Sequence, residues 1–98
     1  MNAQEIIATL KENEAALRAR GVAHAALFGS RARGDERPGS DIDILIEIAP
    51  DAPIDLFAYV AITQFVEDLF PVPVDVANRR ALKPHVRPSA EQQAVYAF

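Results

Sequence analysis

Two apolar segments on either side of a glycine- and arginine-rich loop restrict the possible folds of this chain most strongly. They span residues 22–28 and 42–48, and the loop covers 29–40. In the second segment one residue in two is isoleucine: Ile42, Ile44, Ile46 and Ile48 fall on one face, and Asp41, Asp43, Leu45 and Glu47 on the other. This alternation is typical of a β-strand whose faces meet different surroundings. The pattern predicts two strands joined by a loop with one helical turn after Ser30.

The rest of the chain predicts an α/β (α+β) domain. Helices are expected over 3–20 and 55–70, a third strand over 72–77, a broken helix over 81–93, and a terminal strand or packed tail over 94–98. A capping-box pattern starts the first helix and a glycine stops it. The order α-β-β-α-β-α predicts a small, mixed, three-stranded sheet covered by helices, forming a single domain over 1–98.

Composition narrows the functional classes. The 98 residues are 50% apolar and contain no cysteine, which excludes disulfides and thiolate metal sites and fits a cytoplasmic protein. No segment is apolar enough to cross a bilayer, so no membrane partner is expected. The net charge of −4 makes direct binding of a long nucleic acid unfavourable.

The basic residues nevertheless form two local clusters. Arg31, Arg33 and Arg37 lie beside the glycine-serine turn, and the second cluster comprises Arg79, Arg80, Lys83 and Arg87. Local positive charge in an acidic protein suits one compact polyanion, such as a nucleoside triphosphate.

Three aspartates are candidate metal ligands. Residues i and i+2 of a strand point the same way with Cα atoms about 6.5–7 Å apart, so Asp41 and Asp43 repel each other unless a cation lies between them. Asp75 lies within the predicted third strand, where aspartate is otherwise unfavourable, and would face the same ion if the second and third strands are neighbours. Oxygen ligands of this kind suit Mg²⁺ or Mn²⁺.

The turn at Gly29 and Ser30 is the candidate phosphate site. Glycine allows a close backbone approach, and the N–H groups of the turn together with the Ser30 hydroxyl can donate to phosphate oxygens. Arg31 and Arg33 are within reach of the same oxygens. A metal site and a phosphate site close together predict displacement at phosphorus.

Each of these residues also has an ordinary interpretation. The aspartates can be solvated strand residues, Gly29-Ser30 an ordinary turn, and the arginines surface groups. Their combination in one small domain favours the functional site. Four other polar residues are interpreted as structural or solvated: His24, Ser40, Glu47 and His85.

These motifs resemble the signature of the polymerase-beta-type nucleotidyltransferase superfamily. The resemblance rests on Gly29-Ser30, the Arg-Ala-Arg-Gly that follows and Ser40-Asp41-Ile42-Asp43, and the chain length resembles its minimal nucleotidyltransferase branch. It implies that Asp41, Asp43 and Asp75 are catalytic, metal-binding aspartates and that Gly29 and Ser30, with Arg33, contact the triphosphate.

Members of this branch commonly pair with a HEPN-domain protein. The nucleotidyltransferase is then the antitoxin, in some systems by transferring AMP from ATP onto a tyrosine of the HEPN ribonuclease. The resemblance therefore implies a similar role here, with ATP as substrate and a HEPN partner. Two alternatives stay open, namely an antitoxin that only occludes its partner and transfer to a small molecule.

The small size predicts that a second protein or a second copy completes the site. A patch formed by Leu56, Phe57 and Val60 is the candidate contact surface. The alternative is that these three side chains pack inside the domain, under the first helix or the C-terminal tail.

Overall fold

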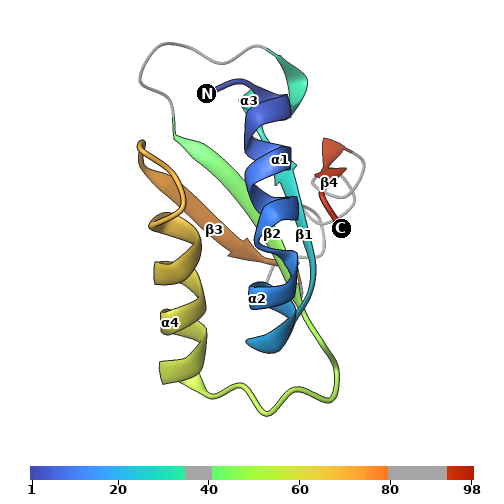
Figure 1. Cartoon of the computed structure of the whole chain (residues 1–98), viewed down its shortest axis with the longest axis vertical. Helices are drawn as coiled ribbons and strands as arrows, with labels where there is room; N and C mark the ends of the chain where they lie inside the picture. Colours follow the sequence, from blue (N-terminus) through green and yellow to red (C-terminus); the bar gives the residue numbers. More distant parts are fainter. Residues whose placement is uncertain (35–40, 80–92) are drawn as a thin grey trace.

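The structure is a computed structural model that describes residues 1–34, 41–79 and 93–98. Along the chain its elements are α1 (Ala3–Glu12), α2 (Glu14–Ala19), β1 (Val22–Phe28), α3 (Ser30–Arg33), β2 (Ile42–Ile48), α4 (Leu56–Glu67), β3 (Val74–Asn78) and β4 (Val95–Tyr96) (Figure 1). The predicted strands over 22–28 and 42–48 and the helical turn after Ser30 are confirmed. The predicted helix over 81–93 lies outside the described residues, apart from Gln93.

The sheet has the strand order β3-β2-β1-β4. β1 pairs antiparallel with β2 and with β4, whereas β2 and β3 are parallel. The prediction of a mixed sheet is therefore confirmed, but the predicted number of three strands is wrong. The fourth strand is only two residues long, Val95–Tyr96, so its sequence pattern is too short to distinguish it from a packed tail.

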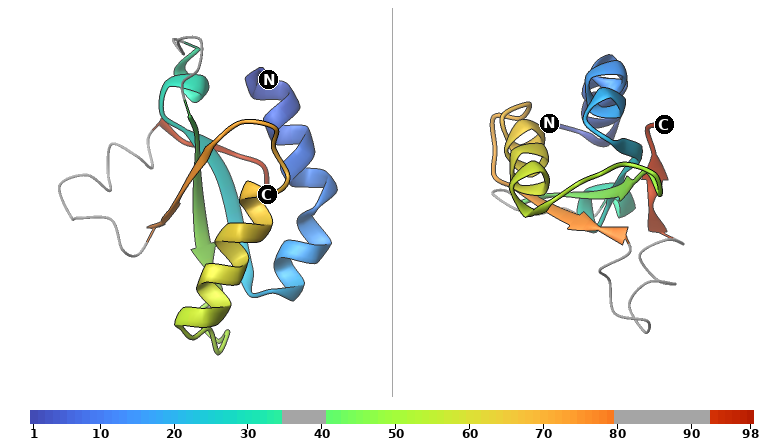
Figure 2. Two further views of the ribbon diagram at one scale, coloured as in Figure 1. Left: turned by 90° about the vertical axis from the view of Figure 1, so that its left-hand side faces the viewer. Right: turned by 90° about the horizontal axis from the view of Figure 1, so that it is seen from below.

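The longer helices α1, α2 and α4 cover one face of the sheet (Figure 2). Isoleucines of β2 point into the core on this face and meet apolar residues of the helices. The core members with no exposed surface include Ile6, Leu10, Leu17, Leu27, Ile42, Ile44, Ile46 and Val66. The alternate residues of β2, Asp43 among them, must then point to the opposite face of the sheet.

The first predicted helix, over 3–20, is interrupted at Asn13. Its start is as expected, because Asn2 and Glu5 form a reciprocal capping box. At Asn13 the side-chain amide donates to the Thr9 carbonyl at 2.9 Å, and the backbone leaves helical geometry before α2 begins. Asparagine competes for backbone groups in this way, so the prediction of one continuous helix is wrong at this residue.

Helix α4 carries the chain from β2 to its parallel neighbour β3. It begins after Asp55, whose carboxylate accepts from the Ala58 amide at 2.8 Å, and it ends three residues before the predicted limit of 70. β3 starts at Val74 rather than at 72, because two prolines precede it. The Pro73 carbonyl still extends the ladder by accepting from the Ile42 amide at 3.0 Å. No helix in the described ranges is long and apolar enough to cross a membrane.

Candidate functional site

The three predicted aspartates lie on the sheet face opposite the long helices. Asp43 of β2 is the register partner of Asp75 in the parallel strand β3. Paired residues of neighbouring strands project to the same face, and Asp41 shares that face because it lies two residues before Asp43. We refer to Asp41, Asp43 and Asp75 as the acidic trio. The prediction for Asp75 required the second and third strands to be neighbours, and β2 and β3 are neighbours in the sheet.

The carboxylates of Asp41 and Asp75 repel that of Asp43. Burial raises the pKa of Asp43 above its ordinary value, and the carboxylates of Asp75 and Asp41 raise it further. The guanidinium groups of Arg33 and Arg31 act in the opposite direction on the same pKa. Ionised Asp43 is thus disfavoured unless a positive charge joins it, which is the behaviour expected of a cation ligand.

The donor set fits a hard divalent cation. Asp41 and Asp75 are exposed, Asp43 is partly buried, and all three offer carboxylate oxygens, the ligands preferred by Mg²⁺ and Mn²⁺. Within the described part of the chain, no three His, Cys, Asp or Glu side chains already surround one ion position. Joint binding therefore needs side-chain rotation, which the two exposed aspartates can undergo at low cost.

Gly29 closes one side of Asp43. Its φ of +77° is rarely adopted by residues with a side chain. A Cβ at this position would overlap Oδ2 of Asp43 and lie 3.0 Å from its Cγ. Glycine was predicted here for its approach to phosphate, and the structure adds that Gly29 makes room for the central carboxylate.

The turn continues directly into α3, whose first residue is Ser30. Gly29 is the N-cap of this helix, and its carbonyl accepts a hydrogen bond from the Arg33 amide at 3.2 Å. β1 and α3 therefore place Gly29 and Ser30 beside Asp43, and a phosphate at this turn would lie next to the acidic trio.

The two arginines of α3 have different environments. Arg31 is buried and its Nη1 donates to the Met1 carbonyl at 2.7 Å, so this side chain ties the start of the chain to α3. Arg33 is exposed, and its Nη1 donates to Oε1 of Gln93 at 3.1 Å. Arg33 thus stays a candidate phosphate ligand, whereas the anchoring role of Arg31 was not foreseen. A contact between residues thirty positions apart leaves no local sequence signal.

Several other predicted residues can now be placed. Glu47 was interpreted as solvated, but it forms an ion pair with Arg79, in which Oε1 of Glu47 accepts a hydrogen bond from Nη1 of Arg79 at 2.9 Å. Nδ1 of His24 lies 3.2 Å from the Phe98 carbonyl. The remaining candidates fall outside the described residues: Arg37, Ser40, Arg80, Lys83, His85 and Arg87.

The candidate contact patch is exposed. Leu56, Phe57 and Val60 have 72%, 84% and 55% of their surface accessible, so the alternative in which they pack inside the domain is wrong. They lie at the start of α4.

Comparison with known proteins places this arrangement in a family. The model of the nucleotidyltransferase domain family matches residues 5–97. A Thermococcus cleftensis protein named protein adenylyltransferase MntA is 30% identical over 94 residues, which cover 95% of this chain and 93% of that protein.

Two solved structures are also similar. One is described provisionally as a minimal nucleotidyltransferase and has a TM-score of 0.79 at 26% identity, covering 97% of this chain and 95% of the other. The second is a complex of a tri-AMPylated Shewanella oneidensis HEPN toxin with an MNT antitoxin. It has a TM-score of 0.63 at 18% identity and covers 94% of this chain and 71% of the other, a likeness of fold. This chain belongs to the nucleotidyltransferase domain family, in its minimal branch.

Proposed function

We propose that this protein is a magnesium-dependent nucleotidyltransferase that transfers AMP from ATP to a side chain of a HEPN-domain protein, as the antitoxin of that pair. The observation that supports this most directly is the parallel register of Asp43 with Asp75, with Asp41 on the same face. Membership of the family supports nucleotidyl transfer. The name of the Thermococcus relative and the AMPylated toxin of the Shewanella complex support AMP as the group and a HEPN protein as acceptor.

In this proposal the acidic trio holds Mg²⁺, or Mn²⁺ in its place. The bound ion supplies positive charge at the triphosphate and lowers the pKa of the acceptor hydroxyl. Asp43 is the central ligand, because it is the trio member that both others perturb. Asp41 precedes it by two residues and Asp75 is its register partner on β3.

Gly29 and Ser30 bind the triphosphate in this proposal, with Arg33 as an additional donor. Close backbone approach at Gly29 and the Ser30 hydroxyl suit phosphate oxygens, and the guanidinium of Arg33 offers a forked pair of N–H donors. The turn adjoins Asp43. The residues that bind the phosphates and the carboxylates that bind the metal therefore contact the same nucleotide in this proposal.

The chemical step is an exchange of bonds at the α-phosphorus. The acceptor hydroxyl oxygen forms a bond to this phosphorus, the bond to the bridging oxygen breaks, and pyrophosphate leaves with the electron pair. The hydroxyl proton passes to Asp75, which lies on the exposed edge strand where an acceptor can approach.

The decisive experiment follows the transfer of labelled AMP. This protein, purified together with a HEPN-domain protein, is incubated with ATP labelled at the α-phosphate and with Mg²⁺. We expect label on the HEPN protein, lost with EDTA and lost in the Asp41→Ala/Asp43→Ala variant. A control variant, Glu12→Ala, removes an exposed carboxylate of α1 outside the trio and should keep full transfer.

The open alternatives predict other results. If the Asp41→Ala/Asp43→Ala variant still labels the HEPN protein, the assigned roles are wrong. If this variant transfers nothing yet fully protects cells from the HEPN protein, occlusion is the relevant activity. Label that appears only on an added small molecule would identify a different acceptor class.

A further inference from the structure

Helix α4 presents an apolar surface that the domain itself leaves uncovered. Phe57 is 84% exposed, Leu56 72% and Val60 55%, and together they occupy one side of the first turns of the helix. Single exposed apolar residues are common, but three large ones side by side are typical of an interaction site. The inward side of α4 is packed normally, since Ile62 and Val66 are buried.

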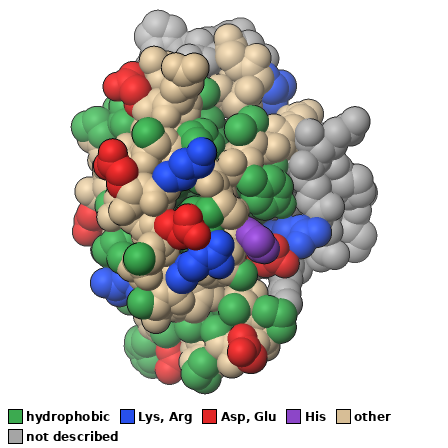
Figure 3. Space-filling view, turned by 45° about the vertical axis from the view of Figure 1, so that its right-hand side comes forward, with side chains coloured by type: hydrophobic (Ala, Val, Ile, Leu, Met, Phe, Trp, Pro, Cys, Tyr) green, Lys and Arg blue, Asp and Glu red, His purple; other side chains and the backbone are tan. Residues whose placement is uncertain are grey.

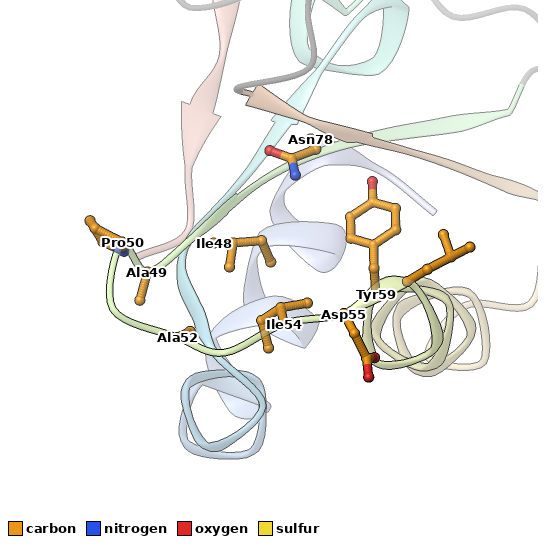
Figure 4. Close-up of a pocket in the computed structure, with 9 residues that line it drawn as sticks. Ile48, Ala49, Pro50, Ala52, Ile54, Asp55, Tyr59 and Asn78 are labelled. Carbon is orange, nitrogen blue, oxygen red and sulfur yellow. The ribbon is translucent and has the colours of Figure 1, made fainter.

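A hollow adjoins these side chains. It has a volume of about 380 Å³ and lies between the start of α4 and the loop that leaves β2 (Figure 4). Ile48 and Ile54 form part of its apolar lining, and Tyr59 of α4 and Asn78 of β3 also line it. Leu56 belongs both to this lining and to the exposed patch. We call Leu56, Phe57, Val60 and the hollow the α4 docking surface.

Among the described residues, the charged side chains of α4 and of the loop before it have one sign. Residues 38–78 contain eight acidic residues and no Lys, Arg or His. Asp51 and Asp55 lie at the start of the α4 docking surface, and Glu67 and Asp68 lie at the far end of the helix. By contrast, basic and acidic side chains alternate on the face shown in Figure 3.

One arginine from another element reaches α4, but further along the helix. The Arg20 guanidinium at the end of α2 stacks on the ring of Phe65 at 4.4 Å. Its charge therefore lies near the C-terminal end of α4, close to Glu67, and not at the exposed patch. The apolar patch keeps acidic borders on both sides.

We propose that the α4 docking surface binds an amphipathic helix of another protein, one whose apolar stripe is flanked by Lys and Arg. An apolar helix face fits a patch next to a hollow that accepts an anchoring side chain. Basic flanks complement the acidic borders. A second copy of this chain fits less well, because a two-fold contact would bring the same acidic borders together.

This inference goes beyond the proposed catalysis and does not depend on it. The hollow lies at the Ile48 end of β2, five residues and about 16 Å along the strand from Asp43. A helix bound there leaves the acidic trio accessible. Loss of this binding and loss of AMP transfer can therefore be observed separately.

The test uses two designed peptides of about 18 residues, long enough to be helical in water. Both carry leucine at i, i+3, i+4 and i+7 and alanine elsewhere, except for the positions that flank the leucine stripe, which are lysine in one peptide and glutamate in the other. Binding to ¹⁵N-labelled protein is followed by fluorescence anisotropy and NMR at about 0.15 M salt, where long-range charge effects are screened. The lysine peptide should bind and shift the amides of residues 54–61, and the glutamate peptide should not.

Two substitutions test the location. Phe57→Glu places a charge at an 84%-exposed position, so the fold is retained while affinity for the lysine peptide falls at least about tenfold. Val95→Glu, on the exposed terminal strand, is the matched control and should leave affinity unchanged.

Three results of the peptide experiment would overturn the inference. They are equal binding of both peptides, NMR shifts centred on the acidic trio instead of on α4, and absence of binding. A dimer in sedimentation experiments that Phe57→Glu dissociates would also overturn it, because the occupant would then be a second copy.

Discussion

Gly29 and Asp43 are adjacent across the end of the sheet, and the missing side chain of Gly29 is what admits the carboxylate. The Cβ of any other residue would overlap Oδ2 of Asp43. One position thus satisfies two requirements, a backbone with positive φ and an unobstructed central aspartate. This contact links the Gly29–Ser30 turn between β1 and α3 to the acidic trio of β2 and β3.

Gly29→Ala should therefore cost more than an ordinary glycine replacement. Gly34 is an internal control, because its φ is +79° but a Cβ there meets no atom of the described residues within 4 Å. We expect Gly34→Ala to cost about 1 kcal/mol in unfolding free energy from backbone strain alone. Gly29→Ala should lose a further 1–3 kcal/mol, roughly, from overlap with Asp43. Urea unfolding of both variants measures the difference, and equal losses would show that the contact is unimportant.

Asp43→Asn should stabilise the metal-free protein. Burial and two neighbouring carboxylates raise the pKa of Asp43 in the folded state. The Asp43 side chain therefore contributes most to stability at pH values below 3.8, the ordinary pKa of an aspartate. That contribution is lost as pH rises through the raised pKa, when Asp43 ionises. The neutral amide avoids this loss.

Thermal melting in EDTA checks this sign. The melting temperature of Asp43→Asn should exceed that of the unmodified protein at pH 7, and the gain should shrink as pH falls toward 3.8. Asp51→Asn, in an exposed loop, is the control and should change little. A lower melting temperature for Asp43→Asn at pH 7 would mean that ionised Asp43 supports the fold.

The sequence predicted most where a pattern is local. Strand β2 was predicted with its limits because isoleucine alternates with other residues over its whole length, and β1 because it ends at Gly29. The residues of the trio could be proposed because an aspartate within an apolar strand is conspicuous. Their meeting could not be derived, since it depends on the register that α4 sets between β2 and β3.

The remaining differences arise from contacts that leave no local pattern. The break at Asn13 reflects a side chain that bonds to the backbone of Thr9, and Asn2 has the same chemistry at a helix start. The burial of Arg31 depends on Met1, thirty residues earlier. The pairing of β4 needs only two residues, Val95–Tyr96, and involves Ala26 and Leu27 of β1.

Magnesium should stabilise the protein only through the acidic trio. In the presence of a non-hydrolysable ATP analogue, the melting temperature should rise as Mg²⁺ is added. The corresponding gain in unfolding free energy is about 2.7 kcal/mol when the Mg²⁺ concentration is a hundred times its dissociation constant. The Asp41→Asn/Asp43→Asn variant should show almost none of this rise. If both proteins respond equally, the ion binds elsewhere.

Truncating a side chain on the buried side of α4 should cost much more stability than truncating one on the exposed side. Ile62→Ala removes a buried side chain and should cost about 2–5 kcal/mol, whereas Phe57→Ala should stay within about 0.5 kcal/mol. Chemical denaturation of each variant measures the two values. A large loss for Phe57→Ala would show that this ring packs within the domain.

Anomalous scattering from Mn²⁺ in crystals grown with a non-hydrolysable ATP analogue tests the central claim most directly. The account predicts a manganese peak that Asp41 and Asp43 ligate, with Asp75 on the same side and the phosphates against Gly29 and Ser30. Manganese bound away from these carboxylates, or nucleotide bound on the helix-covered face, would contradict it.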